Sequence, residues 1–465
     1  MRKLKKFAAL SLVGMLAASA FVGCGKKTTN NSGSSEGSGD VAGLTDGGKV
    51  LNIYVWNDEF INRMVDHYPG YVKVDDLHGK IGDVDVVFTQ VANQDNAYQD
   101  NLDNTFNANG ENQKNAKSPD EKVDIFLAEI DYITKYVNSP WSAPISEYGV
   151  TDADLAKQYE YTKQAATDSN GVLKGVSWQA CSAAMIYRSD IAEKVFGSSE
   201  PDKVQEQVKD WDTFAKAADT LKAAGYQAMA SANDSFRVFS NNVTTKWVDD
   251  EGVLNIDANI EKWAKLSKEM VDKGQCKTFD LWSNEWNDGM KTSSNVFAYF
   301  GPAWLINFCM HASEDGYAAK DGLWKITEGP QSFFWGGTWI LGAAGGDNKT
   351  LVKDIILKMT TDDAVMEGIT RKDSDFVNNT AVNDKLAADA NYKNAILGGQ
   401  NPTQLFVNGL TKIDLSNITA YDQGCNEKFQ AAMKDWFDGN YKSYEEALAD
   451  FHKKIGDKYS DITIK

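Results

Sequence analysis

Past residue 48 the chain alternates between short apolar runs and longer amphipathic stretches, and this alternation limits the possible folds more than any other feature of the sequence. Short apolar runs are typical of strands, and amphipathic stretches with helical spacing are typical of helices. Strands are expected at Val50–Val55, Val84–Thr89, Val123–Ala128, Ala183–Tyr187, Val296–Phe300 and Thr338–Ala343. Helices are expected at Trp211–Ala224, Ile260–Lys273, Lys349–Met359 and Lys428–Phe437. Short strands mixed with longer helices predict an α/β fold with largely parallel sheets.

The length and charge of the chain narrow its class. At 465 residues it exceeds one typical domain, so we expect two lobes. The formal net charge is -18. An acidic surface repels phosphate backbones, so no nucleic-acid partner is expected.

The N-terminus has the layout of a bacterial lipoprotein signal. A basic segment, MRKLKK, precedes an apolar one, FAALSLVGMLAASAF, that is short for a membrane span. The following FVGC resembles a lipobox, although Phe21 stands where that pattern usually has leucine. We expect residues 1–23 to be a cleaved signal peptide and Cys24 to carry lipid. The alternative is an ordinary secretory signal with a chance cysteine.

Residues 24–48 are rich in Gly, Ser and Asn and nearly free of apolar residues. Such a composition cannot form a core, so we expect a flexible tether between the lipid and the folded part. No later stretch is long and apolar enough to span a bilayer. The expected location is extracytoplasmic, lipid-anchored to the outer face of the cell membrane.

The sequence carries none of the common catalytic or nucleotide-binding motifs. It has no GxGxxG after a strand, no Walker A motif, no HExxH and no GxSxG. Its histidines are scattered, and its cysteines form no CxxC pair. For Cys181, Cys276, Cys309 and Cys425, both disulfide pairing and free thiols stay open. We therefore expect no enzyme, no cofactor and no metal site.

The first expected strand ends in VWNDEF, which places an indole, an amide and two carboxylates together: Trp56, Asn57, Asp58 and Glu59. In open α/β sheets, ligands bind outside the carboxyl ends of the strands. An aromatic face beside amides and carboxylates suits sugars, whose C–H groups pack on rings and whose hydroxyls hydrogen-bond at the edge. A helix start, capped by Asn or Asp with Glu suiting the dipole, explains the same residues without a ligand.

Tryptophan is abundant, with 13 in the chain, and several follow expected strands. Those in loop-like positions are Trp56, Trp178, Trp282, Trp304, Trp335 and Trp339. Others, such as Trp211, Trp263 and Trp436, have helical spacing and are expected in the core. Trp335 is followed by Gly336 and Gly337, which let a backbone approach closely, so a role in binding and a role in packing stay open there.

Seven segments in a fixed order carry a family resemblance. They are LNIYVWND, VDIFLAEIDYITKYV, LKGVSWQACSAAMIYRSDIAEKVFG, KDWDTFAKAADTLKAAGY, VFAYFGPAWLINF, SFFWGGTWILGAAGG and GCNEKFQAAMKDWFDGNYKSYEEALADFHKKI. Together they resemble the family 1 extracellular solute-binding proteins of ABC importers, the group that includes maltose-binding protein. The resemblance covers residues 49 to 460 and implies a two-lobe periplasmic-binding-protein-like α/β fold with a hinge and an inter-lobe ligand cleft. It implies lobe 1 at residues 49–178 and 328–375, and lobe 2 at residues 179–327 and 376–465.

The resemblance also implies ligand-binding positions, to which Trp282 is added for its place among the tryptophans. They are Trp56, Asn57, Asp58, Glu59, Glu129, Asp131, Tyr132, Trp178, Gln179, Asn233, Asp234, Trp304, Trp335, Gly336 and Gly337. The family often has an aromatic residue directly after Gly-Pro, whereas this chain has Ala303 before Trp304. Whether Trp304 faces the cleft or the core stays open.

The leading hypothesis is a lipid-anchored, monomeric binding protein that delivers an oligosaccharide to an ABC permease. Xylo-, manno- and malto-oligosaccharides are all compatible with it. A second hypothesis keeps the fold and changes the ligand to a polyamine or other cation, held by carboxylates and rings. A surface glycan-degrading enzyme and a structural lipoprotein are further alternatives.

Overall fold

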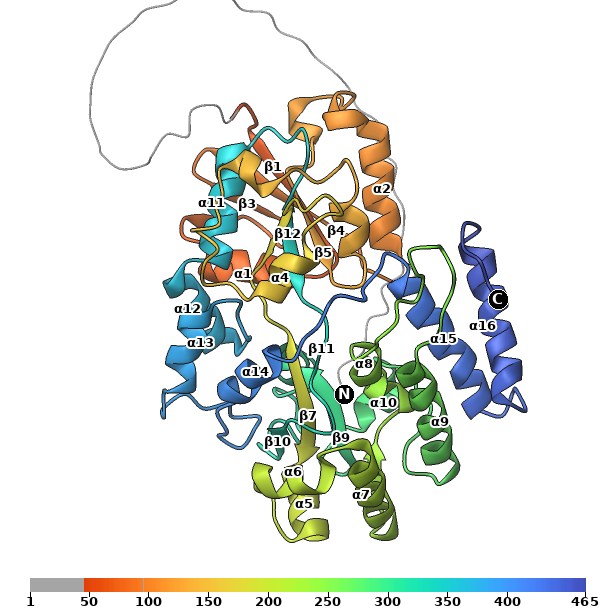
Figure 1. Ribbon diagram of the computed structural model, residues 1–465. Helices are drawn as coiled ribbons and strands as arrows, with labels where there is room; N and C mark the ends of the chain where they lie inside the picture. Colours follow the sequence, from red (N-terminus) through yellow and green to blue (C-terminus); the bar gives the residue numbers. More distant parts are fainter. Residues whose placement is uncertain (1–45, 95) are drawn as a thin grey trace, which may run out of the picture. The chain divides into compact units, whose positions relative to one another are not determined.

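The computed structural model describes residues 46–94 and 96–465. The expected signal peptide, the lipidation site Cys24 and nearly all of the tether lie outside the described residues. Two β-sheets organise the described part, and helices pack around each of them (Figure 1).

The first sheet has seven strands, and its centre is parallel. Its order is β2 (Tyr71–Lys73), β3 (His78–Ile81), β4 (Val84–Gln90), β1 (Val50–Val55), β5 (Ile125–Glu129), β12 (Thr338–Gly342) and β6 (Gly175–Ser177). Strand β1 runs parallel to both β4 and β5, whereas the other neighbours are antiparallel.

The second sheet is smaller and mostly antiparallel. Its order is β10 (Trp324–Thr327), β7 (Ser182–Arg188), β9 (Val296–Pro302) and β8 (Gln227–Met229), with β11 (Phe333–Phe334) also paired to β7. Only β8 and β9 run parallel.

The prediction of largely parallel sheets is wrong, although the strand positions match closely. Strands β2, β3 and β4 follow one another as antiparallel neighbours with short connections, which parallel pairing does not allow. Strands β6 and β12 lie beside each other although about 160 residues of chain, including every strand of the second sheet, separate them. The chain re-enters the first sheet through β12 in the opposite direction to β5.

The longer helices fall into two groups by the core they bury. Around the first sheet lie α1 (Glu59–His67), α2 (Ala97–Asn109), α3 (Ile133–Val137), α4 (Glu160–Ala165), α11 (Lys349–Thr360), α12 (Asp363–Asp373) and α13 (Thr380–Ala387). With the second lie α5 (Ser189–Phe196), α6 (Pro201–Val208), α7 (Trp211–Ala223), α8 (Phe236–Ser240), α9 (Ala258–Asp272), α10 (Asn284–Asp288), α14 (Thr403–Leu410), α15 (Asp422–Phe437) and α16 (Tyr444–Lys458). Short 3₁₀-helical turns are η1 (Glu111–Gln113), η2 (Pro119–Glu121), η3 (Ile145–Tyr148) and η4 (Ala232–Ser235), and η5 (Leu305–Cys309) is a π-helical turn.

Local sequence explains these elements well. In β1 the side chains of Leu51, Ile53 and Val55 are fully buried while their neighbours are half-buried, as the period of a strand requires. Helix α7 begins with a capping box in which Asp210 accepts the backbone N–H of Thr213. Both elements form where their patterns predict them.

The chain crosses between the two sheets through segments that touch one another. The backbone N–H of Ala180 donates to the carbonyl of Phe376 at 2.9 Å, and that of Asn378 donates to Trp178 at 2.8 Å. The backbone N–H of Trp335 donates to the carbonyl of Cys181 at 3.1 Å. Three crossing segments therefore lie together where the two sheets meet, as Figure 1 shows between β12 and β7.

The lobe boundaries remain a proposal, and the sheets suggest one adjustment to them. Strand β11, Phe333–Phe334, pairs within the second sheet, and the chain joins the first sheet only at Thr338. We propose that the return crossing lies at residues 335–337, later than residue 328.

Candidate functional site

Four strand ends of the first sheet meet at one edge because of the strand directions. Strands β1, β4 and β5 are parallel, so the residues after Val55, Gln90 and Ala128 emerge together. Strand β12 is antiparallel to β5 and pairs Thr338 with Glu129, so the residues before Thr338 reach the same edge. This register brings together Trp56, Asn57, Asn93, Glu129, Gly336 and Gly337.

The second sheet presents a matching edge. Strand β9 pairs Pro302 with Ala183 at the start of β7, so the turn that follows β9 reaches the crossing segments. That turn carries Trp304. Asn233, the second residue of η4, lies at the same edge. The edge faces the first sheet across a hollow.

The hollow between these edges is a cavity of about 540 Å³. Its volume falls within the range of small-molecule sites, roughly 300–1,000 Å³. Its lining residues are Trp56, Asn57, Glu59, Asn93, Glu129, Asp131, Gln179, Asn233, Arg237, Leu281, Trp282, Trp304, Phe308, Cys309, Trp335, Gly336, Gly337, Thr338 and Gln430.

Three tryptophans form one wall of the cavity. The ring centroids of Trp304 and Trp335 lie 5.0 Å apart, and the ring of Trp282 lies 6.1 Å and 5.7 Å from them. The indole N–H of Trp304 donates to the carbonyl of Trp335 at 3.1 Å. Gly336 has φ +76°, and a Cβ there would lie 3.1 Å from the Trp304 indole nitrogen, so glycine is needed for this approach. Trp304 thus faces the cavity.

Trp56 forms part of the opposite side, from the first sheet. Its ring makes edge contacts with Tyr98 at 5.7 Å and with Tyr132 at 6.1 Å. These contacts fix the orientation of the indole, which leaves the rest of the ring available to the cavity.

Two carboxyl groups of the lining have altered acidity. Burial, followed by the negative charge of Asp375, raises the pKa of Glu59 to about 7. Burial, followed by the negative charge of Asp131, raises the pKa of Glu129 to about 8. Both groups thus bind protons more tightly than an exposed carboxylate, and both offer acceptor oxygens to a ligand.

An ion pair joins the two sides of the cavity. Asp131 follows β5 of the first sheet, and Arg237 lies in α8 beside the second. The guanidinium donates to both carboxylate oxygens, with Nη1 to Oδ1 at 2.6 Å. Burial lowers the pKa of Arg237, but Asp131 more than offsets it, so the pKa lies above its usual value.

A family model described as "Bacterial extracellular solute-binding protein" matches residues 79–397, which is more than half of the chain. The chain belongs to this family. No curated protein sequence matches it. Among the described residues, no helix has both the length and the apolar character needed to cross a membrane.

Solved structures share the fold of this solute-binding protein at low identity. One is the ABC-transporter-associated binding protein of B. animalis subsp. lactis Bl-04 in complex with β-1,6-galactobiose, with TM-score 0.67 and 16% identity over 90% of this chain and 100% of that one. The galacto-N-biose/lacto-N-biose I-binding protein of Bifidobacterium longum gives 0.65 and 14% over 90% and 100%. The sugar-binding protein MalE of Xanthomonas citri gives 0.65 and 14% over 88% and 96%. The expected two-lobe α/β fold is confirmed.

The structure brings most of the expected ligand-binding residues of this solute-binding protein to the cavity. They are Trp56, Asn57, Glu59, Glu129, Asp131, Gln179, Asn233, Trp282, Trp304, Trp335, Gly336 and Gly337. Tyr132 is buried beneath Trp56 and borders an adjoining cavity of about 390 Å³.

Besides Tyr132, three expected residues lie outside the lining of the cavity. Trp178 is fully buried and stacks on Phe60 at 5.3 Å, so it belongs to the core of the first sheet. Asp234 is 4% exposed and accepts the indole N–H of Trp286 at 2.7 Å. Asp58 is exposed at the start of α1, outside the lining, and it is Asn57 whose side chain accepts the Glu59 N–H.

The sequence reasoning missed several residues of the lining. Asn93 follows β4, so the rule that located Trp56 could have found it. Arg237 lies in α8, Gln430 lies in α15, and Phe308 is 62% exposed in η5. Nothing in the local sequence marks these three, because only the fold brings their helical segments to the cleft.

The cysteines of the described residues form no disulfide. Cys181, Cys276, Cys309 and Cys425 are free thiols in the structure.

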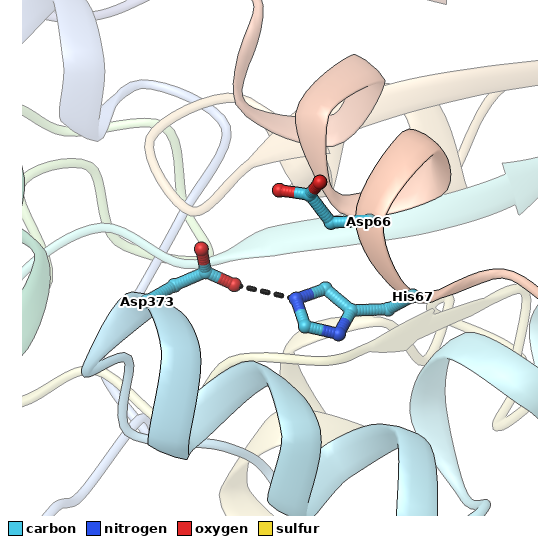
Figure 2. A group of neighbouring side chains, drawn as sticks. All are labelled: Asp66, His67 and Asp373. Carbon is cyan, nitrogen blue, oxygen red and sulfur yellow. Dashed lines mark hydrogen bonds and ion pairs between the residues drawn. The ribbon is translucent and has the colours of Figure 1, made fainter. Parts of the chain in front are cut away.

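A cluster of two carboxylates and a histidine lies outside the cavity. Asp66, His67 and Asp373 lie close together, with His67 Nε2 at 2.7 Å from an Asp373 oxygen (Figure 2). Lys372 lies 2.7 Å from Asp66 and Arg63 lies 3.3 Å from Asp373. With two cations already paired to these carboxylates, we interpret the group as an ion-pair cluster that ties α1 to α12.

Proposed function

We propose that this solute-binding protein captures an oligosaccharide between its lobes and delivers it to an ABC importer, while a lipid on Cys24 holds it at the outer face of the cell membrane. The observation that carries the proposal is a cavity of about 540 Å³ with four tryptophans and a rim of amides and carboxylates. Sugar rings combine apolar faces with hydroxyl edges, which matches this lining.

The named neighbours support the same class of ligand. The B. animalis protein is described in complex with β-1,6-galactobiose, and the B. longum protein with lacto-N-biose. A related protein of Listeria monocytogenes is described in complex with cycloalternan. Because their identity to this chain is 13–16%, they support the class of ligand and leave the particular sugar open.

The proposed mechanism is closure of the two lobes around the sugar. Trp56, Asn57 and Glu59 contact it from the first sheet, while Trp282, Trp304 and Asn233 contact it from the second. Residues 178–180, 335–337 and 376–378 form the hinge. A ligand that contacts both sides stabilises the closed state relative to the open one. The permease then recognises the closed form, and the protein itself performs no catalysis.

The proposal is tested by isothermal calorimetry on residues 49–465, with xylo-, manno-, malto- and raffinose-type oligosaccharides and with spermidine. One-to-one binding of one sugar series with micromolar Kd, about -8 kcal/mol, supports the proposal. Salt-sensitive binding of spermidine alone favours the second candidate ligand, a cationic solute. The carboxylates of the cavity lining are the observation that supports this candidate. Formation of shorter sugars from any oligosaccharide contradicts the non-enzymatic role.

Anchoring is tested separately with the full chain in bacterial cells. The wild-type protein is expected in the membrane fraction and Cys24→Ala in the soluble extracytoplasmic fraction. Equal fractionation of the two contradicts lipid attachment at Cys24. Light scattering of purified residues 49–465 checks the expected monomer.

A further inference from the structure

The lining of the central cavity carries an excess of negative charge. It contains three carboxylates, Glu59, Glu129 and Asp131, and one cationic side chain, Arg237. The ion pair with Asp131 occupies that guanidinium, since both carboxylate oxygens accept from it. Two carboxylates of the lining thus have no cation of the cavity wall as a full partner.

Glu129 has the weaker compensation of the two. Its carboxylate accepts the backbone N–H of Asp131 at 2.8 Å, and among the ion pairs of the described residues Glu129 has none. It is half-buried at the end of β5, opposite Thr338 of β12. A partly buried carboxylate is stable only when charge or hydrogen bonds compensate it, and Glu129 borders both the central cavity and the adjoining one, which Lys428 and Lys458 also line.

Glu59 is compensated in part. Its side chain is 14% exposed, accepts from Gln179 Nε2 at 2.8 Å and lies 3.7 Å from Arg63. Arg63 also lies 3.3 Å from Asp373 and 3.5 Å from Asp375, so its charge is divided among three carboxylates. Glu59 therefore adds negative potential to the same cavity.

The aromatic wall suits a cation as well as a sugar ring. Trp56, Trp282, Trp304 and Trp335 all border the cavity. The faces of indole rings attract cations, and tryptophan is the most effective side chain in this role. Carboxylates beside indoles therefore favour a ligand that is partly apolar and carries a positive charge.

We propose that the captured oligosaccharide carries a protonated amine, as an oligomer of glucosamine does, and that this amine docks against Glu129 with Glu59 as a second acceptor. The inference rests on the proposed function and specifies the chemistry of its ligand. A hydroxyl donates a hydrogen bond to a carboxylate oxygen but does not compensate the negative charge. An ammonium donates the hydrogen bond and also compensates the charge.

The raised pKa of Glu129 supports this assignment. The pKa of Glu129 is raised to about 8 by burial and by Asp131, with Arg237 acting in the opposite direction. Across the adjoining cavity Glu427, Lys428 and Lys458 face the same space. Because the Glu129 carboxylate has little compensation of its own, an ammonium that stabilises this charged form favours the release of a proton on binding.

The test compares matched ligands and matched variants by calorimetry at pH 7. The ligands are a glucosamine trimer, its fully N-acetylated form and the neutral glucose trimer of the same linkage, with spermidine as an amine without a sugar. Glu129→Gln removes the charge at the site and keeps its shape. Glu160→Gln makes the same chemical change at an exposed residue of α4 outside the lining.

We expect the glucosamine trimer to bind at least about 10-fold more tightly than the neutral trimers. Glu129→Gln is expected to remove most of this preference, and Glu160→Gln to leave it unchanged. Titrations in buffers of different ionisation enthalpy are expected to show proton release for the amine-bearing trimer, and less release for this trimer with Glu129→Gln.

Other outcomes separate this inference from the proposed function. Equal or tighter binding of a neutral trimer overturns the amine assignment and leaves the oligosaccharide function standing. A preference that survives Glu129→Gln overturns the role of Glu129. Binding of spermidine alone, or of none of these ligands, overturns the amine inference, and the panel of xylo-, manno-, malto- and raffinose-type oligosaccharides then decides the saccharide function.

Discussion

Trp282 offers the sharpest test of the candidate site. Replacing it by glycine relieves strain in the backbone but removes packing of the side chain, and these two changes have opposite effects on stability. It has φ +71°, in the left-handed region that side chains other than glycine rarely adopt. Its side chain is also 50% exposed, at the wall of the cavity. A half-exposed tryptophan that is held in a strained backbone conformation at the wall of a cavity points to a role in binding.

The magnitudes follow from the structure. A tryptophan buries about 200 Å² when fully enclosed, so half of this, at about 25 cal/mol per Å², gives ~2.5 kcal/mol of packing. The left-handed backbone costs about 1–2 kcal/mol for any residue with a Cβ. Trp282→Gly loses the packing but relieves the strain, so we expect a net loss of about 1 kcal/mol. Trp282→Ala loses the packing and keeps the strain, so we expect a loss of about 2–3 kcal/mol.

The order of the two variants is the decisive result. Glycine is usually less favourable than alanine because it gains more freedom in the unfolded chain. Here the free energy of unfolding, measured in urea, is expected to be higher for Trp282→Gly than for Trp282→Ala. Both variants are expected to weaken binding of the cognate ligand by about 1–3 kcal/mol.

Trp286 provides the control in the same segment. It is fully buried and donates to Asp234, so Trp286→Ala is expected to lower the free energy of unfolding by about 3–5 kcal/mol. A Trp282→Ala variant more stable than Trp282→Gly would refute the strained backbone. Unchanged affinity in both Trp282 variants would remove this residue from the site.

Two further predictions concern charge. Asp131→Asn leaves Arg237 without its charged partner across the cleft, which disfavours the closed arrangement of the lobes by about 1–3 kcal/mol. X-ray scattering is therefore expected to show a larger radius of gyration for this variant without ligand than for the wild type. An unchanged scattering profile contradicts this role of the ion pair. The pKa values of Glu59 and Glu129 in the folded protein, about 7 and about 8, lie above the unfolded value of 4.5. Between these values the folded protein binds more protons than the unfolded chain, so the free energy of unfolding falls as the pH rises from about 5 to 8. Urea midpoints at both ends of this window check the sign, and Glu129→Gln is expected to reduce the slope; an equal slope in this variant excludes Glu129 as a source.

The sequence by itself determined the local elements and the class of the fold. Period-two burial marks β1 at Val50–Val55, and the capping box at Asp210 marks the start of α7, because both patterns depend on neighbours within one element. The order of the sequence segments carries the family resemblance, and this resemblance implied the two-lobe α/β fold and the loops that end at the cleft. Trp56 and Glu129 belong to the candidate site for this reason.

Only the tertiary structure decided which side chain of each loop faces the cavity. Trp178 and Gln179 are adjacent, yet Trp178 packs on Phe60 while Gln179 reaches Glu59, because β6 pairs with β12 far along the chain. The strand directions and the arrival of Arg237 depend likewise on contacts between distant segments. A shift of one residue in a strand turns every side chain to the other face, and no local pattern fixes that register between remote segments.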